Sequence, residues 1–265
     1  MSTQPEAVRP RPALRFRPTQ RSWLVRSRRV ADPALRVVCL PHIGGGAALY
    51  SAWADRLPPR AELCAVRLPG RENRFEEPPI EDMPALLDGL EEALAPLLDR
   101  PYLLFGHCSG SLIAFHLTRR LRAAGRPLPA RLVVTSIEAP AGRVIEDPLH
   151  LLPRPELFRR FADYGGIAHD VLEDPELMAV FEPTIRADYR LVERVPYTPE
   201  PALEVPLTVI GGVDDRFTPY ESLAAWRHET TETFSLHLLK TGHFVLDEAA
   251  GIVARLVADL EESQS

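Results

Sequence analysis

Several features that would assign a chain to a particular class are missing from this sequence of 265 residues. It lacks any apolar run near the roughly 20 residues that a membrane-spanning helix needs. Its formal net charge of −6 lacks the basic excess of general nucleic-acid-binding proteins. Residues 1–29 contain no apolar stretch that could form a secretory signal. We therefore expect neither a membrane nor a nucleic-acid partner, and we take a monomer as the default.

Cysteine is also scarce, and the three cysteines cannot all pair with one another. This favours a cytoplasmic, reducing location, in which thiols remain free. Cys39 and Cys64 lie in apolar, strand-like runs, where cysteine behaves as a small core residue. Cys108 has a different context, described below.

The composition is that of an ordinary globular domain, with 45% hydrophobic and 26% charged residues. Prolines and charges dominate residues 1–20, which predicts a mobile N-terminal extension. We expect residues 21–265 to form one domain, because α/β folds of this size are commonly single units.

Strand-like and helix-like segments alternate through most of this domain, which predicts a doubly wound, mostly parallel α/β sheet. Apolar β-rich runs predict strands, and amphipathic runs predict helices between them. The expected strands are 34–40, 62–67, 102–105, 130–137, 207–210 and 234–239, and the expected helices are 47–57, 84–98, 112–124, 221–228 and 249–260. Between about 140 and 205 the alternation stops, and three helix-like pieces, at 157–164, 175–181 and 184–192, predict an inserted helical lid.

The most informative motif is Gly106-His107-Cys108-Ser109-Gly110, which follows one expected strand and precedes a helix. Strand, glycine-flanked turn and helix form the nucleophile elbow, usually written G-x-S-x-G. The glycines allow a strained turn and close backbone packing. Cys108 is therefore the predicted nucleophile of an acyl-transfer reaction.

In this arrangement an acid and then a histidine follow the nucleophile along the chain. His243 comes directly after the last expected strand, where the histidine belongs. Asp215 and Asp214 follow the 207–210 strand, and we favour Asp215 with Asp214 as the alternative. Glu138, after the 130–137 strand, is a further candidate for the acid. Asp247 is interpreted as a helix-start residue.

Two backbone amides are expected to form the oxyanion hole. The elbow supplies the N–H of Ser109, the residue after the nucleophile. The loop Leu40-Pro41-His42-Ile43-Gly44-Gly45-Gly46 supplies the N–H of Ile43, since its glycines let the backbone approach a substrate. This loop lacks the G-K-[ST] ending of a phosphate-binding P-loop.

Together these segments resemble a type II thioesterase of polyketide synthases and nonribosomal peptide synthetases, an enzyme with the α/β-hydrolase fold. The resemblance covers about residues 23–260, and the separation 243 − 215 = 28 suits the family. The family patterns L-P-H-A-G-G, Y-P-G-R-E, G-H-S-M-G, G-G-D-x-D and G-H-F are matched by residues 40–45, 68–72, 106–110, 211–215 and 242–244. The sequence departs from them at Cys108 for serine, Ser109 for methionine and Val213 for the first aspartate.

The resemblance implies an enzyme that removes acyl groups from the phosphopantetheine thiol of acyl or peptidyl carrier proteins. It implies no metal and no cofactor, because the partner carries the thioester in. It also implies that the second aspartate of the acid motif, here Asp215, is the catalytic acid. Arg71 and the arginines of the N-terminal extension could contact an acidic carrier protein.

Cysteine in place of serine changes the expected fate of the acyl group. The acyl-enzyme would be a thioester, which an amine or a carbanion captures more readily than water does. Hydrolysis by water that His243 activates is the first hypothesis. Acyl transfer or ring closure, to an amide, a lactone or a Dieckmann-type product, is the second. A noncatalytic carrier-binding scaffold is the third, and a serine-to-cysteine change made to trap an acyl-enzyme would look identical.

Overall fold

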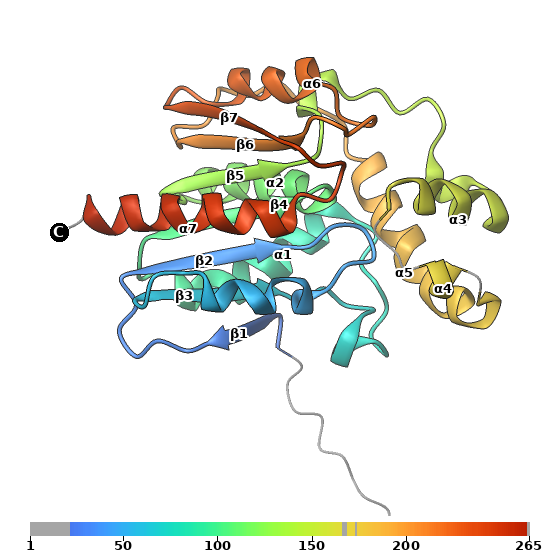
Figure 1. Cartoon of the computed structure of the whole chain (residues 1–265), viewed down its shortest axis with the longest axis horizontal. Coiled ribbons are helices and arrows are strands. Elements are labelled where there is room, and N and C mark those ends of the chain that lie inside the picture. The colour runs from blue at the N-terminus through green and yellow to red at the C-terminus, as the bar shows by residue number, and fades with distance from the viewer. Residues whose placement is uncertain (1–21, 166–168, 173, 264–265) are drawn as a thin grey trace, which may run out of the picture.

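The computed structural model describes residues 22–165, 169–172 and 174–263. A seven-stranded sheet in the order β1-β3-β2-β4-β5-β6-β7 forms its centre (Figure 1). The β1–β3 pair is antiparallel and every other pair is parallel, which confirms the doubly wound α/β prediction. The strands are β1 (Leu24–Arg28), β2 (Leu35–Leu40), β3 (Ala61–Val66), β4 (Tyr102–His107), β5 (Arg131–Thr135), β6 (Leu207–Gly212) and β7 (Phe234–Leu239).

The central strands form because they are apolar enough to be covered on both faces. Every residue of β2, β3, β4 and β6 is buried, as expected of parallel strands packed between helices. Cys39 and Cys64 are fully buried, which confirms both as core residues. The buried charges Arg36 and Glu62 face each other on neighbouring strands and form an ion pair of 3.1 Å.

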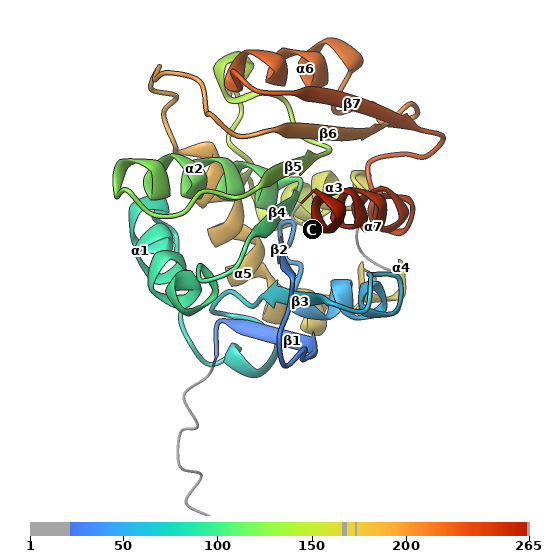
Figure 2. The ribbon, with the colours of Figure 1, turned by 90° about the vertical axis from the view of Figure 1, so that its left-hand side faces the viewer.

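Helices cover both faces of the sheet (Figure 2). One core joins the sheet to α1 (Met83–Leu94), α2 (Ser109–Ala123) and the segment from α6 (Tyr220–Ala224) to Trp226. The other joins it to α7 (Leu246–Glu262) and a 3₁₀ helix, Ala47–Asp55. Asp247 lies in the first turn of α7, which confirms it as a helix-start residue.

Some element boundaries differ from the prediction. The helix expected at 84–98 ends at Leu94, and a 3₁₀ turn follows at Ala95–Leu97, because Pro96 lacks the amide hydrogen that an α-helix would need there. The helix expected at 47–57 is of the 3₁₀ type. Strand β1 was not expected, because it is an edge strand in which three of the five residues are arginine or serine and two of these, Arg26 and Ser27, are exposed.

The 140–205 segment contains α3 (Arg154–Asp163), α4 (His169–Leu172) and α5 (Pro175–Glu193). These helices gather beyond the ends to which the parallel strands point (Figure 1). The two pieces expected at 175–181 and 184–192 are one helix that continues through Pro183, since the residues after the proline are buried in the core. Asp174 caps this helix by accepting two backbone N–H bonds at 3.0 Å. The extension expected at 1–20 lies outside the described residues.

Candidate active site

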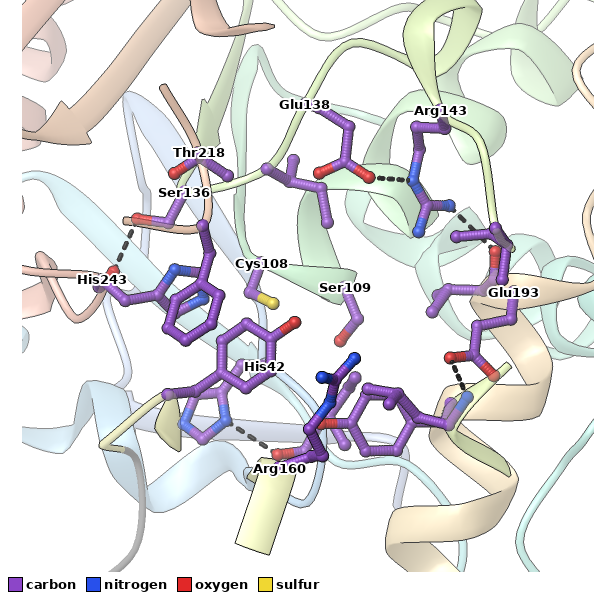
Figure 3. A pocket seen from close by; sticks show the side chains of 18 of the residues that line it. His42, Cys108, Ser109, Ser136, Glu138, Arg143, Arg160, Glu193, Thr218 and His243 are labelled. Atoms are coloured by element: carbon purple, nitrogen blue, oxygen red, sulfur yellow. Dashed lines mark hydrogen bonds and ion pairs between the residues drawn. The ribbon is translucent and has the colours of Figure 1, made fainter. Parts of the chain in front are cut away.

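Cys108 occupies the turn between β4 and α2, with the backbone angles of a nucleophile elbow. Its φ of 50° and ψ of −119° are a strained combination for any residue with a side chain. The Cys108 N–H donates to the Thr135 carbonyl at 2.9 Å, and the Cys108 carbonyl accepts from Ser111 N–H at 2.9 Å. The turn therefore directs the partly exposed Cys108 side chain into a cavity, between His243 and Ser109 (Figure 3).

The two glycines of the elbow are required by close packing. A Cβ at Gly106 would lie 2.4 Å from the Gly110 backbone, and a Cβ at Gly110 would lie 2.4 Å from the Leu40 carbonyl oxygen. The buried Ser111 hydroxyl joins the elbow to β5, because it donates to the Gly106 carbonyl at 2.8 Å and accepts from Thr135 N–H at 2.9 Å. Sequence reasoning missed Ser111, and its place one residue after the G-x-C-x-G motif is the only local signal.

His243 and Asp215 contact each other directly. The Nδ1 atom of His243 lies 2.9 Å from Oδ2 of Asp215, and both side chains are almost completely buried. Asp215 is held by Phe217 N–H, which donates to Oδ1 at 2.9 Å, and by the Thr218 hydroxyl, which donates to Oδ2. The Ser136 hydroxyl donates to the His243 carbonyl at 2.6 Å. These bonds fix the ring orientation, and Nε2 of His243 has no hydrogen-bond partner among the described residues.

The electrostatics of this pair favour a charged imidazole. Burial lowers the pKa of His243, but the bond to Asp215 and the nearby Cys108 thiol outweigh it and raise the pKa to about 10. Burial raises the pKa of the Asp215 carboxyl, but the bond from His243 outweighs this and lowers it below its usual value. A protonated imidazole beside a sulfur atom is the arrangement with which cysteine enzymes hold a reactive thiolate.

The two alternative acids lie elsewhere. Asp214 is exposed, and no contact joins it to His243; its backbone N–H donates to the Thr241 carbonyl at 3.1 Å. Glu138 pairs with Arg143 at 2.7 Å and lines the cavity away from His243 (Figure 3). Of the three predicted acids, the structure brings only Asp215 to the histidine.

The glycine loop after β2 reaches the same cavity. Ile43 lines it and is buried, as Ser109 is, and Ser109 opens α2, where backbone N–H groups have no partner within the helix. Gly45 N–H donates to the His42 carbonyl at 2.9 Å, which closes a tight turn around Ile43. Both expected oxyanion-hole amides therefore belong to residues at the cavity beside Cys108.

A buried ion pair holds this loop in place. Arg71 makes two bonds to the Asp188 carboxylate of α5, at 2.7 and 2.9 Å, and its Nη1 atom also donates to the Gly45 carbonyl at 2.9 Å. Gly44 N–H donates to Asp188 at 2.8 Å. Arg71, considered above as a residue that could contact a carrier protein, is instead only 7% exposed and engaged inside the molecule. Sequence reasoning missed Asp188, since nothing local links it to the loop.

The cavity has a volume of about 460 Å³ and lies between the ends of β4, β5 and β6 and the helices α3 and α5. Its wall combines the residues around Cys108 with aromatic and charged side chains of the 140–205 segment. These include Arg143, Arg160, Tyr164, Tyr189 and Glu193, and Glu138 of the loop after β5 also lines the cavity. The lining is therefore more polar than a simple hydrocarbon-binding tunnel.

Within residues 22–165, 169–172 and 174–263, no three His, Cys, Asp or Glu side chains are grouped so that they could hold a metal ion. In the same ranges no helix combines the length and apolar character required to cross a membrane.

Comparison with known proteins places this site in a family. Residues 35–260 match the family model of the thioesterase domain. The chain is 33% identical to the gramicidin S biosynthesis protein GrsT of Aneurinibacillus migulanus over 86% of this chain and 89% of that protein. It is 35% identical to the AMB antimetabolite synthetase AmbE of Pseudomonas aeruginosa over 89% of this chain, but spans only 11% of that protein.

Among solved structures, the type II thioesterase BorB from the borrelidin biosynthetic cluster superimposes with a TM-score of 0.81. It is 35% identical, and the match covers 90% of this chain and 97% of that one. The α/β-hydrolase fold expected from the motifs is thereby confirmed. The chain belongs to the thioesterase family, as one of the type II thioesterases associated with polyketide and nonribosomal peptide biosynthesis.

Proposed function

We propose that the protein cleaves acyl thioesters carried on the phosphopantetheine arm of acyl or peptidyl carrier proteins, through a covalent acyl-enzyme on Cys108. The observation that carries the proposal is the placement of the Cys108 sulfur in a cavity beside a histidine whose other ring nitrogen is bonded to Asp215. Nucleophile, base and orienting acid in this relation are the requirement for acyl transfer.

In the first half-reaction the Cys108 sulfur attacks the thioester carbonyl carbon, and the carbonyl oxygen becomes an oxyanion. The Ile43 and Ser109 amides stabilise that charge. When the intermediate collapses, the bond to the phosphopantetheine sulfur breaks. His243, which holds its proton because of Asp215, gives that proton from Nε2 to the leaving thiolate.

In the second half-reaction His243 is neutral and acts as a base. Its Nε2 atom removes a proton from water, and the oxygen attacks the acyl carbon of the Cys108 thioester. Collapse of the second intermediate releases the free acid and returns the sulfur and the imidazolium to their starting state. Side chains and water perform every step, so the proposed reaction needs no metal and no cofactor.

Non-hydrolytic capture is the second candidate, and the sulfur itself favours it. Because the acyl-enzyme is a thioester rather than an oxygen ester, an amine, hydroxyl or carbanion within the substrate competes more effectively with water. The products would then be an amide, a lactone or a carbocycle. The two candidates share the first half-reaction and differ only in what attacks Cys108.

The test is to incubate the protein with acyl-carrier thioesters and to follow both protein mass and small-molecule products by mass spectrometry. We expect an acyl adduct on Cys108 and release of free acid, with neither in Cys108→Ala. Cys39→Ala, which removes a buried thiol of the core, serves as the control that keeps the adduct. A cyclic or amide product without free acid would select the second candidate, and an unchanged adduct in Cys108→Ala would refute the proposed nucleophile.

A further inference from the structure

The charged side chains on the cavity wall differ in whether they already have partners. Glu138 is paired with Arg143, whose Nη1 atom also donates to the Val192 carbonyl at 2.9 Å. Glu193 is buried and receives bonds from His150 Nδ1 at 2.6 Å and from the Leu149 N–H at 2.8 Å. These acids have their partners within the protein, so neither needs a ligand to balance it.

Arg160 differs from the other arginines of α3. Arg154 and Arg159 pair with Glu182 and with Asp163. Arg160 is an exposed residue that lines the cavity, as its neighbours Phe161 and Tyr164 do. Figure 3 shows its guanidinium directed into the cavity, on the side of Ser109. In the ranges that the structure describes, Arg160 forms no ion pair and no hydrogen bond.

Two tyrosines bring further donors to the same part of the wall. Tyr164 and Tyr189 line the cavity, and neither hydroxyl has a hydrogen-bond partner among the described residues. Burial raises the pKa of both phenols, so both keep their proton at neutral pH; for Tyr164 the value is about 12. Both phenols interact electrostatically with Cys108, Arg160 and Glu193, and Tyr164 interacts also with Glu138, which Arg143 neutralises. One cationic and two neutral donors therefore surround a space next to the nucleophile, with no acceptor assigned to them.

Two further acids line the cavity and act against an anionic ligand. Glu146 and Asp147 belong to the exposed loop after β5, whereas the three donors belong to α3, its C-terminal end and α5. Arg160 is itself exposed, as Glu146 and Asp147 are, so water and salt screen all three charges. Arg160 is distinguished by the direction of its guanidinium, which points to the side of Ser109, next to the nucleophile (Figure 3).

We propose that this enzyme selects acyl groups that carry a carboxylate, such as dicarboxylic half-thioesters, and that Arg160 with Tyr164 and Tyr189 binds that carboxylate. This inference rests on the proposed function, because it assumes that the acyl carbon is bonded to Cys108. Arginine suits the role, since its planar guanidinium binds a carboxylate through two parallel bonds. Arg160 is thus a specificity-determining residue rather than part of the reaction itself.

The phosphate of the phosphopantetheine arm is a second possible source of the same oxyanion chemistry. It lies at the end of the arm remote from the thiol, whereas Arg160 lines the same cavity as Cys108 and its guanidinium points to the side of Ser109. The acyl group is therefore the part of the substrate that reaches Arg160. Thioesters of pantetheine, which has no phosphate, separate the two sources.

The test compares three pantetheine thioesters of matched length that differ only at the far end of the acyl chain: succinyl, butyryl and β-alanyl. Acylation of Cys108 is followed by intact-protein mass spectrometry, and kcat/KM by thiol release after subtraction of the rate without enzyme. We expect succinyl to be preferred over butyryl about ten- to hundredfold, the usual gain from a charge-assisted pair, and β-alanyl to be the poorest. Equal rates, or a preference for butyryl or β-alanyl, would overturn the inference.

Variants of Arg160 complete the test. Arg160→Met should remove the succinyl preference while butyryl turnover is retained, and Arg160→Glu should transfer the preference to β-alanyl. Arg159→Met, which removes the neighbouring exposed cation, should leave the ratio unchanged. An unaltered ratio in both Arg160 variants would refute the role of Arg160. If Arg160→Met weakens only phosphopantetheine thioesters, the phosphate is the anion and the assignment to the acyl group is wrong. Absence of any adduct with all three thioesters would instead refute the proposed function.

Discussion

The chemistry of Cys108 depends on where its backbone places it and on what faces it. A positive φ at a cysteine is unfavourable, so the surrounding hydrogen bonds must hold the turn. The same is true of Ser136, which also has a φ of 50° and whose hydroxyl holds the His243 carbonyl. Two strained residues at the ends of neighbouring strands thus fix the positions of the nucleophile and of the histidine.

At this scale the choice of acid can be tested with a matched pair of variants. Asp215→Asn removes the charge that holds His243 in its protonated form, and we expect kcat to fall by about 10²-fold or more. Asp214→Asn changes the exposed neighbour and should lower kcat less than about twofold. Steady-state kinetics with a pantetheine thioester give both values, and a larger loss in Asp214→Asn would transfer the role of the acid to Asp214.

The raised pKa of His243 also predicts a pH-dependent contribution to stability. The folded-state pKa of about 10 exceeds the ordinary value of about 6.5, so the folded protein binds this proton more tightly than the unfolded chain does. The resulting stabilisation is fully present below about pH 6.5 and is lost as the pH rises through 10. We expect the difference in unfolding free energy between wild type and His243→Gln, measured in urea, to shrink between pH 6 and pH 10.5. A constant difference across this range would contradict the assigned pKa.

At the scale of elements, close packing between the elbow and strand β2 determines where the site forms. The elbow helix α2 begins directly against the backbone of Leu40 and Pro41, and only a glycine at position 110 leaves room for that approach. The glycine loop that follows these two residues is thereby brought to Cys108. Packing of one backbone on another thus aligns the two expected sources of oxyanion-hole amides.

Two helical glycines provide a direct test of this packing. Gly110→Ala would place a Cβ within 2.6 Å of two carbonyl oxygens, and we expect a loss of several kcal/mol in stability together with loss of activity. Gly251→Ala in α7 meets no atom closer than 3.9 Å and should stabilise the protein by about 0.5–1 kcal/mol. Urea unfolding measures both changes. Equal effects of the two variants would show that close packing does not explain the glycine at position 110.

Much of the fold and the chemical centre of the site could be predicted, because both depend on local patterns. Apolar runs identify the buried strands, and Cys108 and His243 stand in short motifs at the ends of strands. The buried Arg71–Asp188 pair could not be predicted, since the two residues are 117 positions apart and no local pattern joins them. Strand β1 and the continuity of α5 through Pro183 were missed for a related reason: tertiary packing overrides an unfavourable local sequence.

At the scale of the whole molecule, the Arg71–Asp188 pair connects the glycine loop, the segment after β3 and helix α5. Both side chains are at most 7% exposed, so removal of one partner leaves a buried charge without compensation. We expect Asp188→Leu to lower the unfolding free energy by about 3–5 kcal/mol. The double variant Arg71→Met/Asp188→Leu should be less destabilised than the sum of its single changes, because no charge then remains buried.

The activity of the same variants shows whether the pair also serves the reaction. Asp188 accepts the Gly44 N–H, so its loss should displace the loop that carries the Ile43 amide and reduce kcat more than it raises KM. The double variant should recover stability but not kcat, since the bond to Gly44 remains absent. As a control, Glu156→Gln, which breaks an exposed pair with Arg159, should change the unfolding free energy by less than about 1 kcal/mol and leave kcat unaltered. Recovery of kcat along with stability in the double variant would mean that the pair supports the fold alone, and that the glycine loop keeps its position without Asp188.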